Sequence, residues 1–202
     1  GPWKMTGLAN AYYQAKNLKE GEVYFTDLSL YPPSYEAPAG FASTPIFKTN
    51  RRGKKVKIGT LIFQMPLDRI SHIMTTNSGL GSTGETYLVG PDKLMRSDSL
   101  ISPQTHSVVN SFKDKINGRM ITPSTEQALL LKTGEHIVNK FGQEVLSAYA
   151  PIKLGHHRWG LIAEVSTEEA FAPVTNLMHT IVIITAIAIM LIIILALVFS
   201  RK

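Results

Sequence analysis

A long uncharged segment near the C-terminus constrains this chain more than any other feature. Residues 181–199 contain no charged side chain, and Thr185 is the only polar residue among them. A helix rises about 1.5 Å per residue, so the roughly 20 residues of 180–199 would span about 30 Å, the thickness of a bilayer's hydrocarbon core. A buried helix of a soluble protein is normally shorter and keeps a polar stripe. We therefore expect a transmembrane helix over residues 180–200.

The charges that flank this segment predict its orientation. Arg201 and Lys202 follow it directly, whereas the preceding chain carries no Lys or Arg back to Arg158. Because basic residues favour the cytoplasmic side, we expect residues 1–179 outside the membrane and the start of the cytoplasmic part at 201–202. Neither end carries an export signal or a signalling domain. We therefore expect an export signal or first transmembrane helix before this chain, and a cytoplasmic portion after it.

The composition excludes several kinds of site. The chain has no Cys, which excludes disulfide bonds, thiolate zinc sites and a cysteine nucleophile. Its 21 basic and 15 acidic residues give a net charge of +6, but only residues 51–55 (RRGKK) form a basic cluster. We interpret that cluster as a solvated hairpin tip, so no nucleic-acid partner is expected.

The motifs indicate neither catalysis nor a cofactor. Residues 79–84 (GLGSTG) match the G-x-G-x-x-G dinucleotide fingerprint, but here a helix is expected before the glycines and a strand after them. That order is the reverse of the one that binds a pyrophosphate. His156 and His157 are adjacent in a predicted turn, and no third metal ligand lies near them in the sequence. We expect no enzyme activity, no cofactor and no metal site.

Hydrophobic periodicity and turn residues predict the secondary structure of the part before the membrane. We expect helices over 8–15, from Pro66 and from about 124, the last with a capping box of Ser124 and Gln127. Strands are expected over 23–26, 41–47, 58–65, 85–90, 94–96, 143–152 and 158–165. The order predicts an α+β fold with a central antiparallel sheet of about five strands flanked by helices.

The last predicted strand is joined to the membrane helix without a linker. Residues 159–165 form this strand, and Ser166 with Glu169 has the spacing of a second capping box for the helix that follows. A displacement of the sheet could then reach the membrane without being lost in a loose connection. We expect the signal to pass through Trp159, Glu164, Glu169, Phe171 and Pro173.

Aromatic and polar residues on the predicted strands could form a pocket for a small polar ligand. For each of them, core packing or a surface position is the alternative. Arg96 and Asp98 could anchor a carboxylate and an amine, or could pair with each other across a turn, and the pairing is the favoured interpretation. The candidate ligand-binding residues are Tyr24, Asp27, Tyr31, Phe41, Ser43, Phe63, Met65, Tyr87, Arg96 and Asp98.

Two adjacent blocks, 84–92 (GETYLVGPD) and 94–99 (LMRSDS), resemble the membrane-proximal half of a double Cache sensor domain from bacterial methyl-accepting chemotaxis proteins. Further blocks stand in the same order as in that family, and the resemblance covers roughly residues 1–171. These blocks are 25–27 (FTD), 31–34 (YPPS), 37–41 (APAGF), 63–70 (FQMPLDRI), 159–165 (WGLIAEV) and 169–171 (EAF).

The resemblance implies a PAS-like module in the periplasm, anchored in the bacterial inner membrane, that senses small molecules and controls a cytoplasmic signalling module. It also implies a homodimer. In many double Cache receptors the membrane-distal module holds the ligand, and this chain resembles only the proximal half, so the identity of the ligand stays open. The same sensor occurs on membrane histidine kinases and nucleotide cyclases. A membrane-anchored ectodomain without a small ligand is the remaining alternative.

The expected organisation follows from these observations. Residues 1–20 would form a connector helix from the distal module, 21–166 the sensor module, 167–179 a juxtamembrane helix and 180–200 the transmembrane helix.

Overall fold

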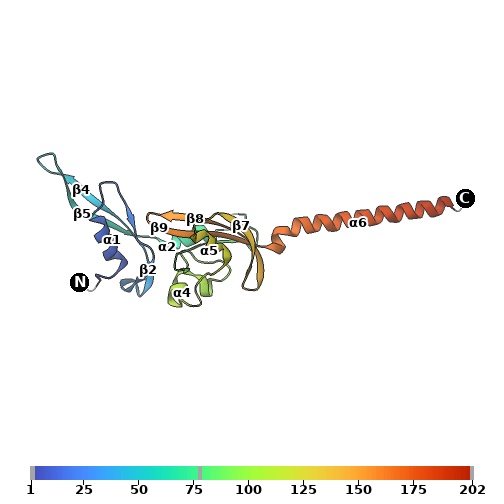
Figure 1. The fold of residues 1–202 in the computed structure, drawn as a ribbon, viewed down its shortest axis with the longest axis horizontal. Coiled ribbons are helices and arrows are strands. Elements are labelled where there is room, and N and C mark those ends of the chain that lie inside the picture. The colour runs from blue at the N-terminus through green and yellow to red at the C-terminus, as the bar shows by residue number, and fades with distance from the viewer. Residues whose placement is uncertain (1–2, 77–78, 201–202) are drawn as a thin grey trace.

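The computed structural model describes residues 3–76 and 79–200, and Figure 1 shows them as an elongated molecule. A small sheet with helix α1 lies at one end, a larger sheet lies in the middle, and helix α6 extends alone beyond it. The expected cytoplasmic start at 201–202 and the first two residues of the expected connector lie outside the described residues.

The N-terminal part forms a three-stranded antiparallel sheet in the order β1-β4-β5, and β2 and β3 pair in a separate two-stranded antiparallel sheet. α1 begins after Thr6, whose hydroxyl accepts a hydrogen bond from the amide of Ala9, and it packs on β4 and β5. Ala11 and Phe41 are buried between the helix and the sheet. The elements are α1 (Gly7–Ala15), β1 (Tyr24–Phe25), β2 (Ser29–Tyr31), η1 (Pro32–Ser34), β3 (Ala37–Ala39), β4 (Phe41–Thr49) and β5 (Lys55–Gln64).

The middle of the molecule is a four-stranded antiparallel sheet in the order β6-β9-β8-β7. Its strands are β6 (Glu85–Val89), β7 (Gly134–Lys140), β8 (Gln143–Leu154) and β9 (His157–Ser166). Helix α5 (Pro123–Leu129) packs against β8 and β9. The apolar core at this sheet contains Tyr87, Val89, Met95, Met120, Ala128 and Ile162.

A second apolar core joins the two sheets. It consists of Leu28, Met65, Leu94, Val108 and Phe112. Helix α2 (Leu67–Thr75) connects the sheets along the chain, and α3 (Pro103–His106) and α4 (Val108–Lys113) lie in the connection between β6 and α5.

The α+β class with antiparallel sheets is confirmed, but the single sheet of about five strands is wrong. The predicted strands within 23–65 form a sheet of their own, and the larger sheet has four strands. Periodicity identifies a strand but not its neighbour, and strand pairing here is decided by contacts distant in sequence. β7 was not predicted, because Glu135, His136, Asn139 and Lys140 give it a polar composition.

Two local predictions have different outcomes. The turn after β6 is present, since the amide of Gly90 donates to the carbonyl of Leu94 and the amide of Arg96 to that of Leu88. The capping box of α5 is formed by Thr122 and Thr125, so the prediction of Ser124 and Gln127 is wrong. Pro123 takes the first helical position, which shifts the cap to the residue before it.

Helix α6 (Thr167–Ser200) is one continuous helix of 34 residues. At about 1.5 Å per residue it is about 50 Å long, so the expected juxtamembrane and transmembrane segments are consecutive parts of one helix. By length and composition it can cross a membrane, and its most apolar stretch is not covered by any described part of the chain. Pro173 lies inside it and has no N–H to donate to the carbonyl of Glu169.

Candidate functional site

A buried ion pair joins the two sheets. The Arg96 guanidinium donates from Nε to Asp27 Oδ1 at 2.7 Å and from Nη2 to Asp27 Oδ2 at 2.8 Å. The indole Nε1 of Trp159 on β9 donates to the same Asp27 Oδ1 at 3.0 Å. Burial alone would raise the pKa of Asp27, but hydrogen bonding to Arg96 and its positive charge outweigh burial and lower that pKa.

The turn after β6 makes room for this guanidinium. A Cβ on Gly90 would lie 2.1 Å from Cζ of Arg96, so only glycine allows the backbone to approach the Arg96 side chain. Arg96 Nη1 also donates to the carbonyl of Leu94 at 3.0 Å, and Nη2 lies 3.0 Å from Asp92 Oδ1. Four of the five N–H donors of Arg96 are therefore used within the protein.

The turn between β8 and β9 supplies a second contact between the sheets. The Nε2 atom of His157 lies 2.9 Å from the carbonyl oxygen of Phe25 on β1, and the ring of His156 lies 6.0 Å from that of Tyr24. The two adjacent histidines thus hold β1 against the larger sheet.

The favoured pairing of Arg96 with Asp98 is wrong. The Asp98 carboxylate instead accepts a hydrogen bond from the amide of Val108 at 2.7 Å, at the start of α4. The main partner of Arg96, Asp27, lies 69 residues away along the chain. A short-range pairing could be proposed from the spacing, whereas the partner that the fold supplies could not.

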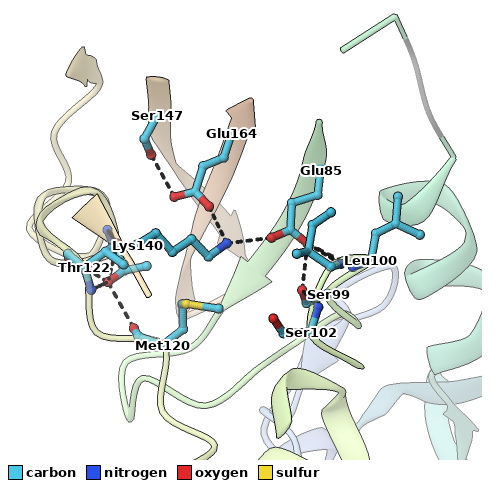
Figure 2. A network of polar contacts seen from close by, with 11 residues as sticks. Glu85, Ser99, Leu100, Ser102, Met120, Thr122, Lys140, Ser147 and Glu164 are labelled. Carbon is cyan, nitrogen blue, oxygen red and sulfur yellow. Dashed lines mark hydrogen bonds and ion pairs between the residues drawn. The ribbon is translucent and has the colours of Figure 1, made fainter. Parts of the chain in front are cut away.

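The second polar cluster lies on the buried face of the larger sheet, and Figure 2 shows its contacts. The ammonium group of Lys140, at the end of β7, lies 2.5 Å from Glu85 Oε1 on β6 and 2.5 Å from Glu164 Oε2 on β9. The side chain of Lys140 is 6 % exposed and those of both glutamates are 2 % exposed. Two carboxylates and one ammonium leave this cluster with one net negative charge.

Glu85 is the better satisfied of the two carboxylates. Its Oε2 accepts hydrogen bonds from the hydroxyl of Ser99 at 2.7 Å and from the amides of Leu100 at 2.9 Å and Ile101 at 3.2 Å. Burial opposes ionisation of Glu85, but the charge of Lys140 and these hydrogen bonds outweigh burial and lower the pKa of Glu85. Glu85 is therefore ionised at neutral pH.

Glu164 has fewer partners. Besides Lys140, it accepts a hydrogen bond from the hydroxyl of Ser147 at 3.0 Å. The fully buried hydroxyl of Tyr87 makes no hydrogen bond of ordinary geometry with the described residues. Burial and the negative charges of Glu164 and Glu85 raise the pKa of Tyr87 well above its usual value, so the phenol stays protonated.

A cavity of about 360 Å³ opens on this cluster. Its size is that of a pocket for a small molecule. The wall combines the three charged side chains with four hydroxyl-bearing residues, one amide and three apolar side chains. The lining residues are Ser82, Thr83, Glu85, Ile101, Ser102, Lys140, Phe141, Gln143, Val145, Glu164 and Ser166.

One wall of the cavity is tied to the first turn of α6. The Glu169 carboxylate accepts hydrogen bonds from the amides of Ser82 and Thr83, both at 2.7 Å, and from the hydroxyl of Thr83. The hydroxyl of Ser166 caps the helix by accepting from the amide of Glu169 at 3.1 Å. A Cβ on Gly81 would lie 2.3 Å from Glu169 Oε1, so this loop needs glycine there. We call this contact the Glu169 anchor.

The anchor corrects one prediction. The predicted capping box of Ser166 and Glu169 is half formed, because the Glu169 carboxylate reaches the loop at 82–83 and not the backbone of Ser166. Of the glycines in 79–84, Gly81 makes room for the Glu169 carboxylate, and the amides of Ser82 and Thr83 in the same loop are occupied by that carboxylate.

The predicted ligand-binding residues come together only in pairs, and none lies among the described residues that line this cavity. The pairs are Asp27 with Arg96, Tyr31 with Phe41 (ring centroids 5.1 Å apart), and Met65 with Asp98, which line a separate cavity of about 400 Å³. Tyr24 and Ser43 are a further pair, because they are register partners across β1 and β4, whereas Phe63 lies on the surface and Tyr87 in the core. Their role in binding stays a prediction.

The predicted transmission residues fall along one path from the junction of the sheets to the membrane helix. Trp159 lies at the ion pair with Asp27, Glu164 in the Lys140 cluster and Glu169 in the anchor. Phe171 is 46 % exposed on α6, and Pro173 follows it.

Sequence reasoning did not single out Glu85 and Lys140, which line the cavity, as candidate site residues. Glu85 stands in a predicted strand whose neighbours, such as Tyr87, are apolar, and a charge on the buried face of a strand is a signal that could have been used. Lys140 offered no such signal, because β7 was not predicted and its partner Glu85 lies 55 residues away.

No known family model matches this chain. A protein of Sinorhizobium fredii named "Probable chemoreceptor y4sI" is 28% identical over 208 residues; the match covers 100% of this chain and 24% of that protein. The chain thus spans about a quarter of the length of this relative.

Two solved structures share the fold. The ligand-binding domain of the Pseudomonas fluorescens chemoreceptor CtaA, in complex with L-alanine, matches with a TM-score of 0.50 and 16% identity, over 83% of this chain and 63% of that one. The ligand-binding domain of the Pseudomonas aeruginosa amino-acid chemoreceptor PctC, in complex with GABA, matches with a TM-score of 0.50 and 16% identity, over 81% and 62%. The predicted resemblance to chemoreceptor sensor domains is confirmed in sequence and in fold.

Proposed function

We propose that this chain is the ligand-sensing and membrane-spanning portion of a bacterial chemoreceptor, and that it acts by conformational change and not by catalysis. The observation that carries the proposal is the direct junction of sheet and membrane helix. β9 ends at Ser166, α6 begins at Thr167, and Glu169 in the first turn of α6 is tied to the loop of Ser82 and Thr83. The similarity of this whole chain to about a quarter of a probable chemoreceptor supports the proposal.

The finer assignments belong to the same proposal. Residues 1–179 would lie in the periplasm, 180–200 would cross the inner membrane, and the chain would continue into the cytoplasm. Residues 21–166 would act as one sensor module with two sheets, and two copies would associate through α6. A small molecule would bind in this module or in a more distal part of the protein.

The geometry gives the signal two points of contact with α6. One is the backbone of β9, one of the two inner strands of the larger sheet. The other is the Glu169 anchor, which ties α6 to the loop before β6. A ligand shifts a two-state equilibrium only by its differential affinity for the two states, typically about 1 to 3 kcal/mol of coupling. A rigid connection suits so small an energy, because little of it is lost in a loose linker.

The test is a chimera in which a chemoreceptor signalling module follows Lys202. Kinase control would be measured against a panel of amino acids, organic acids and polyamines. A Gly-Gly insertion between Val165 and Ser166 should abolish the response while the periplasmic part stays folded. The matched control is a Gly-Gly insertion after Gly53, in the exposed turn between β4 and β5. A response that survives the first insertion would contradict direct transmission from strand to helix.

A further inference from the structure

We infer that the cavity at Lys140 binds a small organic ammonium ion, an amine without a carboxylate. This inference deepens the proposed function and rests on it, because it names the class of molecule that the sensor would detect. Each step follows from the charges, the unused hydrogen-bonding capacity and the size of the cavity.

The charge of the cavity is not balanced. Glu85 and Glu164 are buried with Lys140 as the only Lys or Arg among the described lining residues. The carboxylate of Glu169 lies next to the same wall, bound to Ser82 and Thr83. A net negative charge away from bulk water is unfavourable, and a cation that enters the cavity would offset it.

The unused hydrogen-bonding capacity also favours a donor. A carboxylate offers about four acceptor positions. Glu85 uses four, for Lys140, Ser99 and the amides of Leu100 and Ile101. Glu164 accepts two hydrogen bonds, and the buried Tyr87 hydroxyl lies beside it, so about one acceptor position is left for a donor that enters the cavity.

The remaining walls suit an ammonium ion with a short hydrocarbon part. The aromatic ring of Phe141 lines the cavity beside Ile101 and Val145, and an aromatic face attracts a cation. The volume of about 360 Å³ accommodates a molecule of a few carbon atoms.

The same walls disfavour ligands that carry a carboxylate. The Lys140 ammonium is already shared between two carboxylates, and four of the five N–H donors of Arg96 are used in the other network. A carboxylate in this cavity would thus meet like charges without a free cationic partner.

The experiment uses the full chain in nanodiscs and four probes. Three are organic compounds of similar size that differ in charge, and the fourth is an inorganic cation. These are propylammonium chloride, sodium propionate, 1-propanol and calcium chloride, at matched ionic strength. Propylammonium should raise the midpoint of thermal unfolding with a saturable dependence on concentration, and the other three should leave it unchanged. An equal or larger effect of propionate, propanol or calcium, or no effect of propylammonium, would overturn the inference.

Variants locate the site. Glu164→Gln keeps the shape of the side chain and removes the net charge, so the apparent affinity for propylammonium should fall at least tenfold. Glu126→Gln is the matched control, because that exposed carboxylate pairs with Lys93 outside the cavity, and it should bind as the parent does. If Glu164→Gln fails to fold, Ile101→Trp at the exposed rim should block binding and leave the buried charges in place. Unchanged binding in either cavity variant would overturn the assignment.

The chimera described above separates this inference from the proposed function. If propylammonium does not bind but the chimera responds to other members of the panel, the amine site is wrong and the receptor function stands. If propylammonium binds but no compound changes kinase control, the site stands and the receptor function is wrong.

Discussion

The two buried ion-pair networks of this chain differ in how completely they are neutralised. Arg96 meets one mostly buried carboxylate, Asp27, and one partly exposed carboxylate, Asp92. Lys140 meets two carboxylates that are both buried, next to a cavity. The Arg96 network is closed by Trp159 and the turn at Gly90, and it holds the two sheets together. The Lys140 network keeps a net negative charge beside the cavity of about 360 Å³ and close to α6, where we propose that a ligand binds.

The largest expected effect on stability comes from removing the cation of the Arg96 network. Arg96→Ala would leave Asp27 largely buried without a cationic partner, and we expect a loss of about 3 kcal/mol in the free energy of unfolding. Denaturant unfolding of the full chain in detergent micelles would measure it. Lys93→Ala, which removes only an exposed pair with Glu126, should cost less than about 1 kcal/mol. Similar losses in the two variants would show that the Asp27 pair is not a stabilising contact.

Removing the cation of the Lys140 network should lower the free energy of unfolding by a smaller amount. Lys140→Met leaves two carboxylates together, but one of them can take up a proton, so we expect a loss of about 2 kcal/mol at pH 7. Unfolding midpoints at pH 7 would measure this loss. A cost greater than that of Arg96→Ala would reverse the order of the two networks.

The stability of Lys140→Met should also depend on pH in the direction opposite to that of the parent chain: it should rise as the pH is lowered. In the parent chain the pKa of Glu85 is lowered, so its contribution to stability is present above its unfolded value of 4.5 and is lost as the pH falls through the lower folded value. In Lys140→Met, burial and the neighbouring carboxylate raise the folded pKa of one glutamate, so lowering the pH from 8 toward 5 should stabilise this variant. Unfolding midpoints across this range would show it, and a flat profile would contradict it.

The smallest effect on stability is expected at the Glu169 anchor, which is exposed. Glu169→Gln keeps the helix but weakens the hydrogen bonds to the loop, so the amides of Ser82 and Thr83 should exchange with deuterium several-fold faster. Glu168→Gln is the matched control, because Glu168 lies in the same turn but it is Glu169 that accepts the hydrogen bonds from the loop in the described part of the chain. Equal exchange in both variants would exclude the anchor as a link between the larger sheet and α6.

The sequence predicted those parts of the molecule whose cause lies within a few residues. The apolar run of α6, the turn at Gly90 and the start of α5 follow from local composition, and the structure contains them. The division into separate sheets and both ion-pair networks depend on contacts between residues distant along the chain, such as Glu85 with Lys140. A single sequence carries no direct record of such contacts. β7 was missed because its inward positions include the polar His136 and Lys140 while the apolar Ile137 is exposed, so the usual alternation of a half-buried strand is absent.

Pro173 has a mechanical consequence for the membrane helix. It removes the backbone hydrogen bond that would otherwise reach the carbonyl of Glu169. The helix α6 is therefore least stiff about one turn beyond the Glu169 anchor. A helix with one compliant turn bends there easily but keeps its length. Sideways tilting of the sheets would be absorbed at this joint, whereas a push or pull along the helix axis would travel its whole length.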